Sequence, residues 1–256
     1  MKNTLGINMN TQVFAHRGAS GYAPENTIEA IELANNLGAH GIEIDVQLTR
    51  DNLLVVCHDE RIDRVSNGIG RIADMRYSEL KKLKFNRTHP EYANAKLSTL
   101  QEILEFVKDT NMHINIELKN SRTANPILEE KCLECVALLG MEERVLFSSF
   151  NHHSMVALKN LQPKAYCGLL YAHTMVEPWK YAKTLGVDAI HPEYHELLLI
   201  EDTVAQAHTN CLQVNTWTVN EDQAMKSLIL KGVDRLITNY PDRALSVLNQ
   251  LNKGAG

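Results

Sequence analysis

The chain has 256 residues, of which 44% are hydrophobic and 22% are charged, and its formal net charge is -5. This length is normal for a single α/β barrel, and the composition is that of an ordinary globular protein. An acidic chain offers no broad basic surface, which argues against nucleic acid as a partner. No apolar run is long enough to span a membrane, and the N-terminus carries no apolar signal segment. We therefore expect a cytoplasmic protein without a stable membrane anchor.

The cysteines agree with a reducing compartment. Their number, five, is odd, and no secretion signal accompanies them, so we expect reduced thiols. Cys132 and Cys135 form a C-x-x-C pair inside a helical pattern, but no second pair completes a zinc site. We interpret them as two thiols on a helix.

Short apolar runs alternate with longer amphipathic stretches along the chain. The runs occupy residues 13–16, 41–46, 113–118, 145–150, 166–171, 188–192, 212–217 and 235–239. This alternation is typical of βαβ units with parallel strands, and its extent predicts a (β/α)8 barrel formed by one domain over residues 1–256. An open, doubly wound sheet is the alternative, but the G-x-G-x-x-G loop usual after its first strand is absent.

The second run is followed by a break in this rhythm. Residues 50–52 (RDN) predict a turn, and the apolar residues after them predict a returning strand, which together indicate a hairpin. Residues 59–98 are then rich in turn formers and charge, with one short helix predicted at residues 77–83. We interpret residues 59–98 as a small insertion over one end of the barrel. Catalysis in barrels occurs where the strands end, so this insertion would shape the active site.

Carboxylates occur on two of the predicted strands. Glu43 and Asp45 are two residues apart, so their side chains point to the same face of one strand. Inside a barrel mouth they stay charged together only beside a cation, and Glu117 on the next barrel strand supplies a third carboxylate. Oxygen ligands without histidine or thiolate predict a hard cation, Mg²⁺ or Ca²⁺, rather than zinc. The alternative is a structural network with arginine or lysine.

Histidines and cations follow the same strand ends. His16 and His58 each come directly after a strand and titrate near neutral pH, so they can act as a general acid and a general base. Arg17 and Lys119 are cations suited to phosphate oxygens. Together with a metal, this set predicts the cleavage of a phosphate ester.

The remaining histidines are interpreted differently. His191 ends the sixth strand, has no evident partner in the sequence and stays ambiguous. The histidines that we interpret as structural or surface residues are His152, His153, His173, His195 and His208.

The sequence resembles the glycerophosphodiester phosphodiesterase family over essentially the whole chain. The matching stretches are AHRGASGYAPENT, GIEIDVQLTRDNLLVVCHDERIDRVSNGIG, LSTLQEIL, INIELK, SSF, NTWTVN and LITNYPD. The first two are long, ordered and specific. The resemblance implies a TIM barrel with a small insertion after the second strand.

The resemblance also implies roles for individual residues. His16 and His58 look like the acid–base pair, and Arg17 and Lys119 look like phosphate contacts. The residues that look like metal ligands are Glu43, Asp45 and Glu117. The aromatic positions that match those near the substrate glycerol are Phe150 and Trp217, for which packing at the barrel mouth is the alternative.

Three further positions belong to matching stretches. Glu25 and Asn26 lie in the PENT motif, where Asn26 is also a candidate cap for the helix that starts nearby. Asn239 stands where many relatives have aspartate, so no role is carried over to it.

The activity that the resemblance implies is the metal-dependent hydrolysis of glycerophosphodiesters, the deacylated remains of phospholipids, to sn-glycerol 3-phosphate and an alcohol. One alternative is a phospholipase D-like enzyme acting on lysophospholipids, which needs an apolar rim or anchor. Another is a barrel that binds a phosphate ligand without turnover. The sequence does not choose the alcohol, Mg²⁺ or Ca²⁺, the role of each histidine, water or the substrate 2-hydroxyl as nucleophile, or the oligomeric state.

Overall fold

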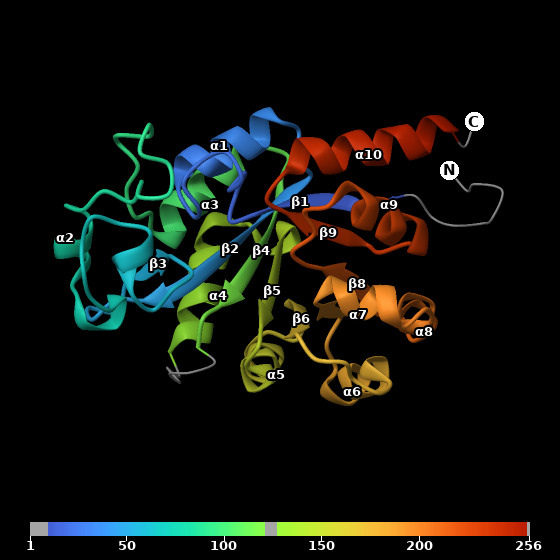
Figure 1. Ribbon diagram of the computed structural model, residues 1–256. Helices are drawn as coiled ribbons and strands as arrows, with labels where there is room; N and C mark the ends of the chain where they lie inside the picture. Colours follow the sequence, from blue (N-terminus) through green and yellow to red (C-terminus); the bar gives the residue numbers. More distant parts are fainter. Residues whose placement is uncertain (1–9, 121–126, 255–256) are drawn as a thin grey trace.

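The structure, a computed structural model, describes residues 10–120 and 127–254, and its parallel strands close into a barrel (Figure 1). The barrel strands are β1 (Gln12–His16), β2 (Gly41–Leu48), β4 (His113–Leu118), β5 (Val145–Ser149), β6 (Tyr166–Tyr171), β7 (Ala189–Pro192), β8 (Gln213–Thr216) and β9 (Arg235–Thr238). The sheet closes because β1 pairs in parallel with both β2 and β9. The predicted (β/α)8 barrel is therefore confirmed, and the open sheet is wrong.

Helices cover the outside of the barrel. They are α1 (Ile28–Asn36), α3 (Leu100–Lys108), α4 (Leu128–Leu139), α5 (His152–Leu161), α6 (Pro178–Leu185), α7 (Tyr194–Leu199), α8 (Thr203–Thr209), α9 (Asp222–Lys231) and α10 (Pro241–Gly254). The start of α3 shows how the sequence sets a boundary. Thr99 accepts a hydrogen bond from the Glu102 backbone, and the Glu102 side chain accepts one from the Thr99 backbone, which makes a capping box.

Strand β2 is buried on both faces, and its two faces differ in chemistry. Ile42, Ile44 and Val46 are fully buried in the apolar core that the strands share with the helices. The alternate residues, Glu43 and Asp45, point to the barrel interior, because successive side chains of a strand face opposite ways. The isoleucines and valine thus fix the strand so that two carboxylates face inward.

The chain between β2 and α3 adds a smaller layer to the barrel, drawn in cyan and teal (Figure 1). Strand β3 (Leu54–Val56) returns antiparallel to β2, which confirms the predicted hairpin. It is followed by two 3-10 turns, η1 (Ile62–Arg64) and η2 (Ile72–Asp74), and by α2 (Tyr77–Leu80). The helix expected over residues 77–83 is shorter, because the chain after Leu80 continues as a turn in which Leu83 N–H bonds to the Leu80 carbonyl.

This layer is held by an apolar cluster of its own. Its buried members are Val55, Cys57, Ile62, Val65, Ile72, Leu80, Phe85 and Leu97. Ile62 and Val65 come from η1 and the residue after it, and they fix that turn against β3.

The expectations about membrane-spanning segments and about the cysteines concern parts of the chain outside the site. Within residues 10–120 and 127–254, no helix is long and apolar enough to cross a membrane. Residues 1–9, where the sequence shows no apolar signal segment, lie outside the described residues. Cys132 and Cys135 lie on α4 and are free thiols, as are the other three cysteines.

His191, ambiguous in the sequence, lies fully buried inside the barrel. Its Nε2 accepts a hydrogen bond from Asn215 Nδ2 at 2.7 Å. Burial and then the charge of Arg235 lower the pKa of His191 to about 3, so the imidazole is neutral. Gly168 on the neighbouring strand leaves room for the ring, because a Cβ there would overlap it. These contacts make His191 a packing residue of the barrel interior.

We expect Gly168→Ala to lower the free energy of unfolding by roughly 1–3 kcal/mol, the usual cost of overpacking a filled core. Urea denaturation measures this loss. In a His191→Ala background the added methyl would enter the space left by the ring, so the two losses should sum to more than the loss in the double variant. Simple additivity of the two changes would contradict the packing role.

Candidate active site

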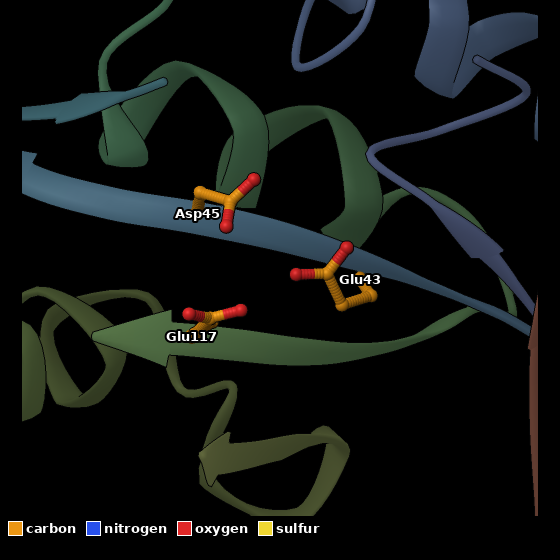
Figure 2. Close-up of side chains that lie close together, drawn as sticks. All are labelled: Glu43, Asp45 and Glu117. Atoms are coloured by element: carbon orange, nitrogen blue, oxygen red, sulfur yellow. The ribbon is translucent and has the colours of Figure 1, made fainter. Parts of the chain in front are cut away.

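Three carboxylates meet inside the barrel near the carboxyl ends of β2 and β4 (Figure 2). The pairing of these strands places Asp45 opposite Glu117, and the pairing of β1 with β2 places Glu43 opposite His16. Ligand oxygens of Glu43, Asp45 and Glu117 lie within 4.8 Å of one another. Glu43 and Asp45 are 4% and 0% exposed, and the Glu117 side chain is 12% exposed.

Two cations lie among these carboxylates. Arg17 Nε is 3.3 Å from Asp45 Oδ2, and Lys119 Nζ is 2.7 Å from Glu117 Oε1 and 3.5 Å from Asp45 Oδ1. A network of carboxylates with arginine and lysine, the alternative to a metal site, is therefore present, but it is incomplete. Glu43 forms no ion pair with a lysine or arginine of the described residues, and its Oε2 accepts the Arg17 backbone N–H at 3.0 Å.

The pKa values of the carboxyl groups reflect this shortage of positive charge. Burial, followed by the charges of Asp45 and Glu117, raises the pKa of Glu43 well above its ordinary value. Burial and Asp45 also raise the pKa of Glu117 to about 7, although Lys119 opposes the shift. Burial acts to raise the pKa of Asp45, but the charges of Arg17, Lys119 and His58 outweigh it and the pKa is lowered.

The donor set fits a divalent metal ion. Glu43 Oε1 and Asp45 Oδ1 are buried and have no hydrogen-bond partner among the described residues. A cation bound by oxygens of the three carboxylates would satisfy them and allow all three to ionise together. Oxygen-only ligands suit a hard cation, because histidine and thiolate ligands select softer metals.

The loop after β1 brings a second set of contacts to Asp45. Arg17 and Asn26 have φ values of 56° and 61°, in the left-handed region that residues other than glycine rarely adopt. Asn26 Nδ2 donates to Asp45 Oδ2 at 2.8 Å. Asn26, a candidate cap of the next helix, is not its cap, because Thr27 is the residue whose side chain accepts the Ala30 backbone N–H.

His16 and His58 both lie at this mouth, each with its Nδ1 on a polar partner. His16 Nδ1 is 2.7 Å from Asn239 Oδ1, and its Nε2 is 3.9 Å from Glu43 Oε2. His58 Nδ1 is 2.7 Å from Asp59 Oδ1. Burial and then Arg17 lower the pKa of His16 to about 4, and burial also lowers the pKa of His58. The low pKa keeps the His16 imidazole neutral at neutral pH and able to accept a proton.

A cavity of about 770 Å³ opens beside His58 and Lys119. The residues that line it together with these two are Asp59, Glu60, Arg61, Asp63 and Arg64. All five come from the chain segment after β3, so this segment forms a wall of the site. The side chains that line it all end in polar or charged groups, which suits a polar ligand.

The two aromatic residues expected near the site are in contact with each other. Phe150 and Trp217 pack edge to face, with ring centroids 5.4 Å apart. Trp217 Nε1 donates to the His191 carbonyl at 2.8 Å, whereas Phe150 is 39% exposed. Phe150 therefore offers an apolar surface that Trp217 supports.

Sequence reasoning gave no role to Asp59, which contacts His58, or to Arg64, which contacts Glu25. Arg64 Nε is 2.6 Å from Asp59 Oδ2, and Arg64 Nη1 is 2.6 Å from Glu25 Oε2. Both residues lie in the same matching stretch as His58, and Asp59 directly follows it. That proximity was the available signal, but the link to Glu25, 39 residues from Arg64, comes only from the fold.

A barrel whose strand ends gather buried carboxylates, cations and histidines has the arrangement of a barrel enzyme with its active site at this mouth. Comparison with known proteins narrows this class. Residues 16–243 match the glycerophosphoryl diester phosphodiesterase family, and the chain belongs to that family of phosphoric diester hydrolases.

Individual relatives cover nearly the whole chain. A glycerophosphodiester phosphodiesterase of Caldanaerobacter subterraneus is 40% identical over 96% of this chain and 100% of its own length. One from Bacillus altitudinis is 37% identical over 94% and 99%. A phosphodiesterase of Oleispira antarctica, solved with its product sn-glycerol-3-phosphate, has a TM-score of 0.88 and 28% identity over 93% of this chain and 96% of that one.

We expect Mg²⁺ or Ca²⁺ to raise the Tm of the metal-free protein and Glu43→Gln to remove most of this rise. Metal at a hundredfold excess over its Kd adds about 2.7 kcal/mol of stability. Differential scanning fluorimetry with and without EDTA measures the shift. Metal-free Glu43→Gln should be at least as stable as wild type, because it relieves like-charge repulsion.

The matched control is Glu129→Gln, which changes a buried glutamate that accepts a hydrogen bond from Asn120 at 3.0 Å outside the cluster. It should keep the full metal-induced rise. An equal rise in wild type and Glu43→Gln would show that the metal binds elsewhere.

Proposed function

We propose that this chain hydrolyses glycerophosphodiesters to sn-glycerol 3-phosphate and an alcohol with a divalent metal, Mg²⁺ or Ca²⁺. The observation that carries the proposal is the gathering of Arg17, Lys119 and two histidines around three buried carboxylates at one barrel mouth. The product bound by the Oleispira antarctica relative supports the same substrate class.

The inner part of the site would hold the metal and the phosphate. Glu43, Asp45 and Glu117 would hold the ion, which when bound supplies positive charge that polarises a phosphoryl oxygen. Arg17 is fixed by Asp45 through Nε and by Glu25 through Nη1 at 2.9 Å. In the described part of the chain its Nη2 has no hydrogen bond, so this nitrogen is available to a phosphate oxygen. Lys119 adds a second positive charge.

The partners of the two histidines favour different roles. Asp59 is an anion on Nδ1 of His58, and it would stabilise the imidazolium form. His58 also lines the charged cavity, so we assign its imidazolium form the protonation of the leaving alkoxide there, which returns His58 to the neutral imidazole. Asn239 is a neutral acceptor for the Nδ1–H of His16, which leaves the Nε2 lone pair free to accept a proton from the nucleophile. If the substrate 2-hydroxyl attacks first, the two roles exchange in the second step.

The cavity beside His58 bears on the choice of alcohol. Its lining side chains end in polar or charged groups, which can form hydrogen bonds and ion pairs with a polar alcohol but not with an acyl chain. A small polar alcohol such as choline or ethanolamine suits this lining better than the acyl glycerol of a lysophospholipid. The exposed face of Phe150 would cover the carbon side of the glycerol.

We expect release of glycerol 3-phosphate from glycerophosphocholine and glycerophosphoethanolamine with Mg²⁺ or Ca²⁺ and none with EDTA. His16→Ala and His58→Ala should each lower kcat by roughly 100- to 10,000-fold, the usual contribution of a positioned acid or base. A coupled assay for glycerol 3-phosphate measures the rates.

His195→Ala is the matched control, because His195 also has its Nδ1 on a carboxylate, Glu193 at 2.8 Å, but lies on α7 with 65% of its side chain exposed. It should keep wild-type rates. Hydrolysis of lysophosphatidylcholine with none of the two diesters would favour the phospholipase D-like alternative. Tight binding of glycerol 3-phosphate without any turnover would favour the non-catalytic one.

A further inference from the structure

We propose that Arg64 is a positioning residue that locks the acid–base His58 to the phosphate-binding Arg17 through two carboxylates, Asp59 and Glu25. The inference rests on the proposed function only for the roles given to His58 and Arg17. The contacts that carry it belong to the structure itself.

Arg64 uses both edges of its guanidinium. Nε donates to Asp59 Oδ2 at 2.6 Å, while Nη1 and Nη2 donate to Glu25 Oε2 and Oε1 at 2.6 and 2.8 Å. The pair with Glu25 is bidentate, which fixes direction as well as distance. A lysine could not replace it, because an ammonium is a single point of charge and lacks the planar fork.

Each carboxylate that Arg64 binds also contacts a residue with a proposed role. The other oxygen of Asp59 lies 2.7 Å from His58 Nδ1, and Glu25 Oε1 accepts from Arg17 Nη1 at 2.9 Å. The result is one connected row of side chains, His58–Asp59–Arg64–Glu25–Arg17. Arg17 and Glu25 come from the loop after β1, whereas His58, Asp59 and Arg64 come from the segment after β3. Arg64 therefore joins two separate parts of the chain.

The backbone at Arg64 is held in place by buried neighbours, although the Arg64 side chain is 44% exposed. Arg64 ends the 3-10 turn η1, and its neighbours Ile62 and Val65 are 0% and 5% exposed in the apolar cluster under β3. Exposed ion pairs contribute little to stability. The position of Arg64 therefore matters chiefly for the orientation of Asp59 and Glu25.

The loss of Arg64 has two consequences for His58. Asp59 loses the donor on its second oxygen, so its orientation against the imidazole is less fixed, although His58 Nδ1 still holds it in contact. In that contact the charge of Asp59 is no longer shared with Arg64 and favours the imidazolium more strongly. The other charges that act on His58 are Asp45, Arg17 and Lys119, and they remain in place.

The test compares Arg64→Gln and Arg64→Lys with wild type by kinetics on glycerophosphocholine and by NMR. In metal-loaded protein labelled with ¹⁵N-histidine, the His58 signals are assigned by their loss in His58→Ala, and a pH titration then gives the His58 pKa. We expect Arg64→Gln to lower kcat by roughly 10- to 100-fold, since a misplacement of about 1 Å can cost about 100-fold, and to raise the His58 pKa. Arg64→Lys should recover only part of both.

Arg243→Gln is the matched control. Arg243 is 40% exposed and binds Asp222 through Nε and Nη2 at 3.0 and 2.6 Å, away from the row of side chains that ends at His58. This variant should keep the wild-type kcat and His58 pKa.

A double-variant cycle with Asp59→Asn shows whether Arg64 acts on His58 through Asp59. In that background Arg64→Gln should leave the His58 pKa unchanged, and the combined loss in kcat should be smaller than the product of the single losses. An unaltered His58 pKa and kcat in Arg64→Gln would overturn the proposal, and so would fully multiplicative losses. If glycerophosphocholine is not a substrate, the proposed function fails, but the NMR titration still decides the role of Arg64.

Discussion

Negative charge confined inside a barrel is the constraint on which the arrangement of this mouth depends. The apolar face of β2 holds Glu43 and Asp45 inward, and the register with β4 sets Asp45 beside Glu117. Burial prevents water from screening these groups, so each neighbouring cation has a large effect. Arg17, whose backbone is left-handed, and Lys119 both place positive charge against Asp45.

The same constraint extends outward from Asp45. Arg17 is shared between Asp45 and Glu25, and Glu25 in turn needs Arg64, which also holds Asp59. Each charged residue of this series, from Asp45 in the barrel interior to Asp59 after β3, thus has a partner of opposite charge. Because the segment after β3 has its own apolar cluster, its position is fixed independently of the ion pairs. The ion pairs can therefore orient the side chains of Asp59 and Glu25.

Periodicity in the sequence was sufficient for the barrel, because each strand carries its own local signal. It also placed Glu43 and Asp45 on one face, since that follows from a spacing of two. Contacts across strands were different. Asn26 lies next to a helix start and was a candidate cap, but Thr27 is the cap and Asn26 instead reaches Asp45, 19 residues away. The role of His191 depends on Gly168 and Asn215 on two other strands, and the link from Arg64 to Glu25 depends on the pairing of β1 with β2.

Charge balance explains how the two cations could act together with the candidate metal-binding carboxylates. Glu43, Asp45 and Glu117 carry three negative charges when ionised, and Arg17 and Lys119 return two positive ones, so the inner site is one charge negative. A divalent ion changes the sum to one positive, and a phosphodiester carries one negative charge. The substrate would therefore bring the site to neutrality. A cluster neutralised by arginine and lysine alone would have no such attraction for an anion, and one built without Arg17 and Lys119 would stay negative even with the ion bound.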